Sequence, residues 1–273
     1  MRLMLTDVVQ GADKVGLELP MGKTKVMSNG IGRFTNRRTT AVSGSKVEIL
    51  PVWDATMYLG KNLSLTYLHD VELDNRIAKA WGAFNKHRVG LCNRGVSLNA
   101  RLKLFDSVVS STALYASGTW TMTRERERKL RTAQRKMLRQ VLGIPWGPEA
   151  DELDNVESFV TWITFATSKI KGFVETGALL DWVSEQRKRK WKWAGHCARR
   201  TDNRWTRRFL DFQLPTSRAR GRPRARWSDD IVKFLQSEGM IGPEESWIDV
   251  AQSREFWNQD NQCKKFMKFN ALV

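Results

Sequence analysis

The amino-acid sequence predicts a mainly α-helical protein that begins with a small β-hairpin segment. Three observations favour this prediction. Apolar residues alternate only in short runs before residue 60, and from about residue 70 onward they recur with the 3.6-residue period of a helix. A third observation is the length, because 273 residues suffice for about two domains of roughly 150 residues. We therefore expect a β segment, then a helical bundle, then a basic helical C-terminal domain.

Before residue 70 the sequence predicts one short helix and three short strands. Apolar positions at helical spacing predict the helix, and Gly16 is a suitable residue to end it. Two of the strands flank Ser43-Gly44-Ser45, a pattern that is typical of a β-hairpin. Gly60 ends the last strand. The helix is expected at 1–15 and the strands at 40–42, 46–50 and 57–59.

Amphipathic stripes predict three successive helices between residues 70 and 142. Asp70 and Ser97 are the expected N-caps of the first two helices. Gly143 is the expected C-cap of the third. Since the connections are short, we expect these helices to form a small bundle. They are expected at about 70–91, 97–113 and 123–142.

Helical periodicity continues after an acidic break near residues 147–155. Ser228-Asp229-Asp230 is typical of a helix start, because a capping hydroxyl precedes two carboxylates in the first turn. The last 30 residues, including Trp247 and Trp257, predict one or two short helices. A basic loop is expected at 215–226, and two helices before it at 156–174 and 178–199.

The formal charge of +17 belongs to two segments of the chain. Residues 124–139 hold eight Arg or Lys against two Glu, and residues 187–227 hold fifteen against two Asp. The remainder is close to neutral. Concentrated positive charge indicates a polyanionic partner, most often nucleic acid. The simpler alternatives are solubility or a nuclear-import signal in the RKRKWK run.

The first basic segment predicts a helix with an arginine face. At 100° per residue its arginines fall within an arc of about 80°, and the apolar positions gather on the opposite side. Because the guanidinium fork binds phosphate bidentately, this face is a candidate phosphate contact, and a merely solvated face is the alternative. The candidate residues are Arg124, Arg128, Arg131, Arg135 and Arg139.

The second basic segment combines Arg and Lys with Trp. The cations of residues 187–192 surround the helix expected at 178–199, so one solvated face does not account for them. Trp191, Trp193, Trp205 and Trp227 fit either a core or stacking on bases within a basic groove. Residues 220–223, Arg-Gly-Arg-Pro, resemble an AT-hook core, whose arginines enter a narrow minor groove. The candidate binding residues are Arg187, Lys188, Arg189, Lys190, Lys192, Arg220, Arg222 and Arg224.

Catalytic and metal-binding patterns are scarce. A polymerase needs clustered carboxylates for two divalent ions, and the only adjacent aspartates, Asp229 and Asp230, fit a helix start. The histidines are scattered, and Gly22-Lys23-Thr24 lacks the first glycine of a P-loop. Three distant cysteines predict no disulfide framework and favour an intracellular compartment. No apolar run approaches the ~18–20 residues of a membrane span.

Short motifs follow one another along nearly the whole chain. Residues 16–27 read GLELPMGKTKVM and residues 58–60 read YLG. Others are LKLF at 102–105, LYASGTW at 114–120, QRKMLR at 134–139, WAGH at 193–196 and GRPRARWSDD at 221–230. Their order and spacing resemble the C-terminal part of a non-LTR (LINE-type) retrotransposon reverse transcriptase. In that family the first motif belongs to the palm and has Asn where this chain has Pro20, and the second motif belongs to the primer grip.

The resemblance implies a division of the chain and roles for single residues. Lys23 and Lys25 would lie near the incoming nucleotide, while Tyr58, Leu59 and Gly60 would press the primer end toward the catalytic metals. The arginine face would line the thumb, and the basic tail would hold template RNA or target DNA. The implied parts are a palm remnant with primer-grip hairpin at 1–68, a thumb-like helical bundle at 69–146 and a basic Trp/Arg-rich helical tail at 147–273.

The resemblance also implies that this chain has no complete polymerase site. The family's metal-binding Asp pair stands just before the palm motif, and no such pair precedes Lys23 here. We therefore expect a fragment of an RNA-directed DNA polymerase that binds RNA, DNA or hybrid template-primer but does not polymerise alone. No cofactor is expected for this chain, and Mg²⁺ only for a full-length polymerase.

The expected partners are nucleic acid and the upstream polymerase segment, and not a membrane. The expected location is intracellular, either nuclear or in a cytoplasmic ribonucleoprotein. Two alternatives stay open. One is an exapted nuclear DNA-binding protein that uses residues 187–227, and the other is a transposon relic without a selected role.

Overall fold

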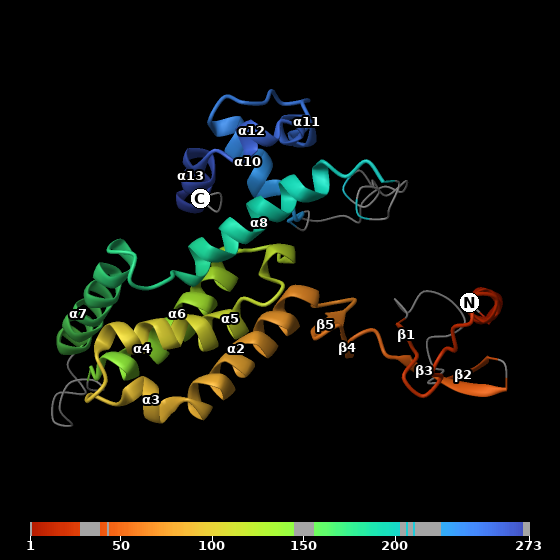
Figure 1. Cartoon of the computed structure of the whole chain (residues 1–273), viewed down its shortest axis with the longest axis horizontal. Coiled ribbons are helices and arrows are strands. Elements are labelled where there is room, and N and C mark those ends of the chain that lie inside the picture. Colours follow the sequence, from red (N-terminus) through yellow and green to blue (C-terminus); the bar gives the residue numbers. More distant parts are fainter. Residues whose placement is uncertain are drawn as a thin grey trace. The chain divides into compact units, whose positions relative to one another are not determined.

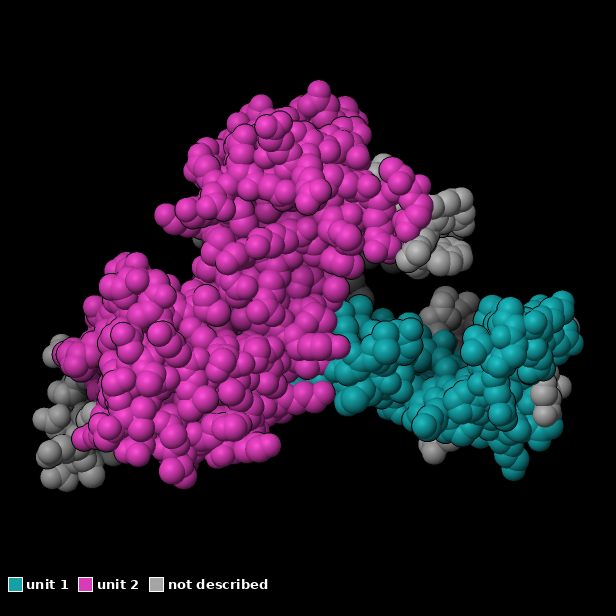
Figure 2. Space-filling view, viewed as in Figure 1, with its two compact units in different colours: residues 1–75 teal, residues 76–273 magenta. Residues whose placement is uncertain are grey.

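In the computed structural model the chain is mainly α-helical, with a few short strands near the N-terminus (Figure 1). This arrangement confirms the predicted fold class. The chain divides into two compact units, an N-terminal unit of residues 1–75 and a C-terminal unit of residues 76–273 (Figure 2). The structure describes residues 2–27, 39–42, 44–144, 156–202, 206, 210 and 225–269.

The N-terminal unit contains the predicted helix and hairpin. Helix α1 (Arg2–Asp13) ends before Gly16, whose φ of 72° lies in the left-handed region. Strands β2 (Thr39–Val42) and β3 (Ser45–Leu50) form the antiparallel hairpin, and β1 (Lys25–Met27) joins β3 in parallel, which gives the order β1-β3-β2. Val47 and Ile49 alternate with exposed residues along β3 and are buried, so one face of this sheet forms a small core.

A second hairpin follows, and only its first strand was predicted. Strand β4 (Ala55–Tyr58) pairs antiparallel with β5 (Lys61–Ser64), with Tyr58 opposite Lys61. Leu59 and Gly60 form the two-residue turn between them, with φ values of 48° and 78°. The buried carboxylate of Glu72 accepts a hydrogen bond of 2.7 Å from the backbone N–H of Asn62, and this bond ties β5 to the following helix.

The first long helix begins earlier and ends earlier than its stripe predicted. Helix α2 (Leu68–Lys86) starts two residues before Asp70, so the prediction of Asp70 as N-cap is wrong and its carboxylate lies in the first turn. The stripe expected to continue to residue 91 is divided between α2 and the short α3 (Arg88–Cys92). Phe84 and Leu91 are buried, but Arg88 is exposed.

The second predicted helix contains an unpredicted π-helical turn. Helix α4 (Leu98–Leu104) continues into the π-helix η1 (Phe105–Ser110) and then α5 (Ser111–Ala113). Ser97 caps α4 as predicted, because its side chain accepts a hydrogen bond from the N–H of Ala100. The short 3-10 helix η2 (Ser117–Thr119) follows.

Side chains of the π-helix contact Leu180 and Trp182, at the start of helix α8 (Trp182–Ala198). The Ser110 hydroxyl accepts a hydrogen bond of 2.7 Å from the Trp182 indole N–H and donates one of 2.8 Å to Asp106. The other carboxylate oxygen of Asp106 accepts from the backbone N–H of Leu180. Burial raises the pKa of Asp106, and the hydrogen bonds from Ser110 and Leu180 oppose this rise.

The third predicted helix is α6 (Arg124–Leu142), and Gly143 is its C-cap as expected. The Thr123 side chain accepts a hydrogen bond from the N–H of Arg126, and Gly143 adopts the left-handed conformation. Helices α7 (Val156–Glu175) and α8 (Trp182–Ala198) lie near the predicted ranges. The predicted boundary at residues 147–155 lies outside the described residues.

Four further helices follow α8 within the described residues. They are α10 (Asp229–Ser237), α11 (Trp247–Gln252), α12 (Arg254–Trp257) and α13 (Asp260–Lys268), so the C-terminal segment contains three short helices where one or two were predicted. Trp191 of α8 lies in their common core, with its ring stacked on Trp257 and packed against Phe234 and Phe266. In the described part of the chain, no helix has both the length and the apolar character that crossing a bilayer requires.

Candidate nucleic-acid interface

Helix α6 carries its arginines and its apolar side chains on different sides. Leu130, Ala133, Met137 and Val141 are buried, as the helical period predicts. Arg124 and Arg128 at the start of the helix are exposed, whereas Arg131, Arg135 and Arg139 are partly buried. The exposed end of this arginine face therefore lies in the first two turns of the helix.

The last arginine of the face lies against an aromatic ring. The Arg139 guanidinium carbon is 5.2 Å from the centre of the Trp162 ring of α7. Burial lowers the pKa of Arg139, and the neighbouring Arg135 lowers it further. Arg139 thus has a packing role in addition to its charge.

Glu127 joins α6 to the basic helix α8. Glu127 lies in the first turn of α6, and its side chain is buried and accepts a hydrogen bond of 2.6 Å from the Arg187 guanidinium. Arg187 also donates to the backbone oxygen of Met267 in α13, 3.1 Å away. Arg131 lies 3.7 Å from the second carboxylate oxygen of Glu127. Breaking a buried pair of this kind typically costs about 3–5 kcal/mol.

Lys190 is also buried and paired. Its ammonium group is 2.7 Å from one carboxylate oxygen of Asp230 and 2.8 Å from the other, and it lies 5.2 Å from the centre of the Trp227 ring. Burial lowers the pKa of Lys190, and Asp230 opposes that effect. Asp230 is therefore more than a first-turn carboxylate of α10, because it neutralises a lysine that is 1% exposed.

The other cations of α8 lie nearer to the surface. Lys188 and Arg189 are partly buried and both contact Glu185, and Arg189 also donates a hydrogen bond of 2.7 Å to the backbone oxygen of Leu114. Lys192 is exposed. Positive charge does not surround this helix evenly, because Arg187 and Lys190 point into ion pairs inside the C-terminal unit.

The tryptophans of this segment differ in their burial. Trp191 lies in the core, whereas Trp193 is 40% exposed and its ring stacks on His196 with 5.4 Å between centroids. Trp227 is partly buried and donates a hydrogen bond to the backbone oxygen of Gly118. Trp205 and the arginines of the AT-hook-like motif, Arg220, Arg222 and Arg224, lie outside the described residues.

The candidate residues of the N-terminal unit are mostly exposed. Lys23 is exposed, and Lys25 forms an ion pair of 3.0 Å with Glu48 on the paired strand. Tyr58 and Leu59 project from the turn of the β4–β5 hairpin and are exposed, and Gly60 completes that turn. Within the described ranges, no three His, Cys, Asp or Glu side chains come together in a way that could hold a metal ion.

Sequence reasoning missed Glu127 and Asp230, the acidic partners of α8. They pair with residues 60 and 40 positions away along the chain. Such pairs have no short-range pattern, and both acids also fit an ordinary helix first turn. The only available signal was the excess of cations around α8, which exceeds what one solvated face requires.

One comparison with known proteins found a relative that derives from a transposon. Over 256 residues the chain is 28% identical to another protein, and this match covers 93% of the chain and 86% of the relative. The relative is a transposon-derived protein of Caenorhabditis elegans. This similarity supports a transposon origin for the chain. No protein-family model and no solved structure matches the chain.

Proposed function

We propose that the chain is part of a non-LTR retrotransposon reverse transcriptase and that it binds RNA, DNA or an RNA–DNA hybrid. The observation that carries the binding proposal is the arginine face of α6. This helix is capped at both ends and buries its apolar side, so Arg124 and Arg128 are presented on a rigid element. The transposon-derived relative and the order of the palm, primer-grip and thumb motifs support the assignment to a retrotransposon.

The dimensions of the arginine face suit a nucleic-acid backbone. From Arg124 to Arg135 the helix rises about 16 Å, at 1.5 Å per residue. Double-stranded nucleic acid carries roughly one negative charge per 1.7 Å of its axis with both strands counted, so this length corresponds to about five phosphates on each strand. Arginine suits such a contact because its guanidinium binds phosphate oxygens in a planar, bidentate manner.

Salt dependence of binding tests this proposal. We expect the double variant Arg124→Gln/Arg128→Gln to bind duplex more weakly. The plot of log binding constant against log salt concentration should also become less steep by about 1.8, since each lost phosphate contact contributes about 0.9 to its slope. Fluorescence anisotropy with a labelled duplex and with a hybrid at several salt concentrations gives both quantities.

The matched control is Lys86→Gln/Arg88→Gln, which removes two exposed cations of the same unit. The control should retain the slope of the unchanged protein. Equal slopes for both double variants would refute a contact through α6. If the protein prefers AT-rich duplex and Arg222→Ala abolishes that preference, the nucleic-acid contact would be assigned to the basic tail instead of α6.

A further inference from the structure

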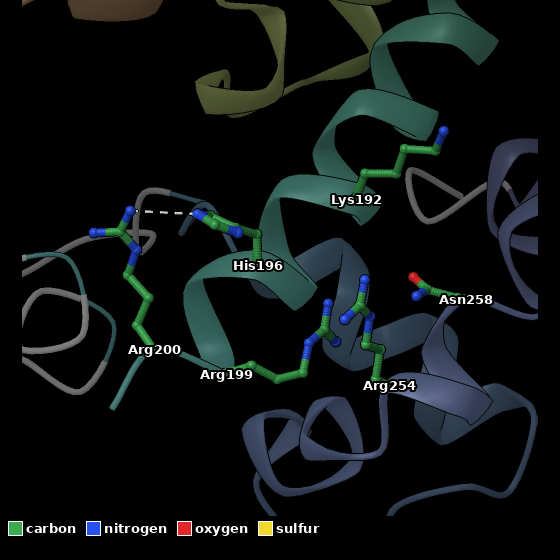
Figure 3. Close-up of a pocket in the computed structure, with 6 residues that line it drawn as sticks. All are labelled: Lys192, His196, Arg199, Arg200, Arg254 and Asn258. Atoms are coloured by element: carbon green, nitrogen blue, oxygen red, sulfur yellow. Dashed lines mark hydrogen bonds between the residues drawn. The ribbon is translucent and has the colours of Figure 1, made fainter. Parts of the chain in front are cut away.

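A cationic cavity lies at the C-terminal end of α8, where this helix contacts α12. Its volume is about 590 Å³, within the range of roughly 300–1,000 Å³ that is typical of small-molecule sites. The lining side chains come from α8, from the two residues that follow it and from α12 with its C-cap (Figure 3). They are Lys192, His196, Arg199, Arg200, Arg254 and Asn258, and none is acidic.

The core fixes the two helices that form this cavity. The Trp191 and Trp257 rings stack with 3.9 Å between centroids, and each indole N–H donates to the backbone oxygen of the other residue, at 2.9 Å and 2.8 Å. Gly195 permits this contact, because a Cβ atom there would lie 2.4 Å from the Trp257 ring. Arg254, three residues before Trp257, is therefore held opposite the end of α8.

Like charges are brought together in this cavity. Figure 3 shows the guanidinium groups of Arg199 and Arg254 side by side. Arg199 is oriented by a hydrogen bond of 2.9 Å to the backbone oxygen of Ala251, and burial together with the nearby Arg254 lowers its pKa. Two adjacent cations in a concave site repel each other, and an anion bound between them would relieve that repulsion.

Carboxylates neutralise only part of this charge. Arg200 lies 3.6 Å from Asp202, and its other terminal nitrogen is 3.4 Å from His196 Nε2. Among the ion pairs found in the described part of the chain, none includes Lys192 or Arg254. The cavity thus presents cations whose natural complement is an anion with several oxygen acceptors.

We propose that this cavity binds the phosphomonoester group of a nucleotide, either at the end of a nucleic-acid strand or in a free mononucleotide. Binding of a strand end rests on the proposed nucleic-acid binding, and it adds a site that recognises the phosphate at the end of a strand. A phosphomonoester carries a charge of about −1.5 to −2 near pH 7, whereas an internal phosphodiester carries −1. The phosphomonoester therefore complements two converging arginines better than a phosphodiester does. Asn258 and His196 supply further hydrogen-bonding groups for the remaining oxygens.

The test compares two single-stranded oligonucleotides of one sequence, one with a 5′-phosphate and one with a 5′-hydroxyl. We expect the phosphorylated strand to bind at least threefold more tightly in fluorescence anisotropy. Arg254→Gln should remove this difference, as should Lys192→Gln. Both side chains are exposed, so these variants should fold. The control Arg128→Gln should weaken both strands equally and preserve their ratio.

Thermal unfolding with a nucleoside 5′-monophosphate or with inorganic phosphate separates the possible sources of the phosphate. A rise in Tm with the mononucleotide supports the cavity if Arg254→Gln abolishes that rise. This holds even if neither oligonucleotide binds, and in that case only the proposed nucleic-acid binding fails. Equal affinities for the two strands, with no Arg254-dependent rise in Tm for either small anion, would overturn the proposal.

Discussion

Gly195 is the residue on which the packing of the C-terminal core depends most directly. It lies in the last turn of α8, and glycine within a helix is unfavourable by about 1 kcal/mol relative to alanine. The close approach of the Trp257 ring explains why glycine stands there, since any side chain would displace one of the stacked indoles. Glycine is therefore unfavourable for α8 as a helix, but it permits the close contact between α8 and α12.

We expect Gly195→Ala to destabilise the C-terminal unit by about 1–3 kcal/mol, the usual cost of overpacking a core. The matched control is Gly172→Ala in α7, where a new Cβ atom meets nothing within 4 Å. That variant should be neutral or stabilising by up to about 1 kcal/mol. Urea unfolding followed by far-UV circular dichroism measures both. Equal effects of the two substitutions would show that the close contact with Trp257 is not formed.

Single residues also show what the sequence alone could indicate about the site. The periodicity of α6 was enough to separate its arginine face from its buried face, because that separation depends only on local helix geometry. Neither the burial of Lys190 nor its pairing with Asp230 could be read in this way, because tertiary packing decides them. Arg254 was overlooked for the same reason, since it joins Arg199 only in the folded chain.

Among the elements, helices with clear caps were predicted best. The C-terminal end of α6 follows from Gly143, and the start of α4 follows from Ser97. The π-helix η1 and the strand β5 were not foreseen. The π-helix occurs within an uninterrupted apolar stripe, and β5 has the sequence Lys-Asn-Leu-Ser, which carries little β-propensity. Pairing with β4, through a turn at Leu59 and Gly60, is what makes β5 a strand.

The turn of this second hairpin carries measurable backbone strain. Leu59 has a φ of 48°, a conformation that typically costs a non-glycine residue about 1–2 kcal/mol. We expect Leu59→Asn to stabilise the hairpin by about 1 kcal/mol, because asparagine tolerates this region and favours such turns. Slower hydrogen exchange of the β4 and β5 amides would report the gain. The control Leu65→Asn replaces another exposed leucine, one without positive φ, and should leave this exchange unchanged.

At the scale of the whole molecule, the apolar core is divided unequally between the two units. Among the described residues, the buried apolar side chains of the N-terminal unit are Val42, Val47, Ile49, Leu50 and Leu73. The C-terminal unit has a far larger set, including the aromatic cluster around Trp191. Since stability rises with buried apolar surface, the N-terminal unit should be the less stable of the two.

We therefore expect two unfolding transitions, the first confined to residues 1–75. Ile49→Ala should lower only the first midpoint, and Phe234→Ala only the second, each by an amount that corresponds to about 2–5 kcal/mol. Calorimetry, together with hydrogen exchange measured by mass spectrometry, assigns each transition to a unit. A single cooperative transition shifted by both variants would contradict this division.

The stacked pair Trp191 and Trp257 also gives the protein an optical signature. Two indoles with 3.9 Å between centroids and 6° between planes lie close enough to couple their electronic transitions, and this coupling changes the aromatic circular dichroism. That signal exists only while α8 and α12 are docked. The chain thus contains a built-in spectroscopic reporter for the docking of α12 on α8, one that needs no added label.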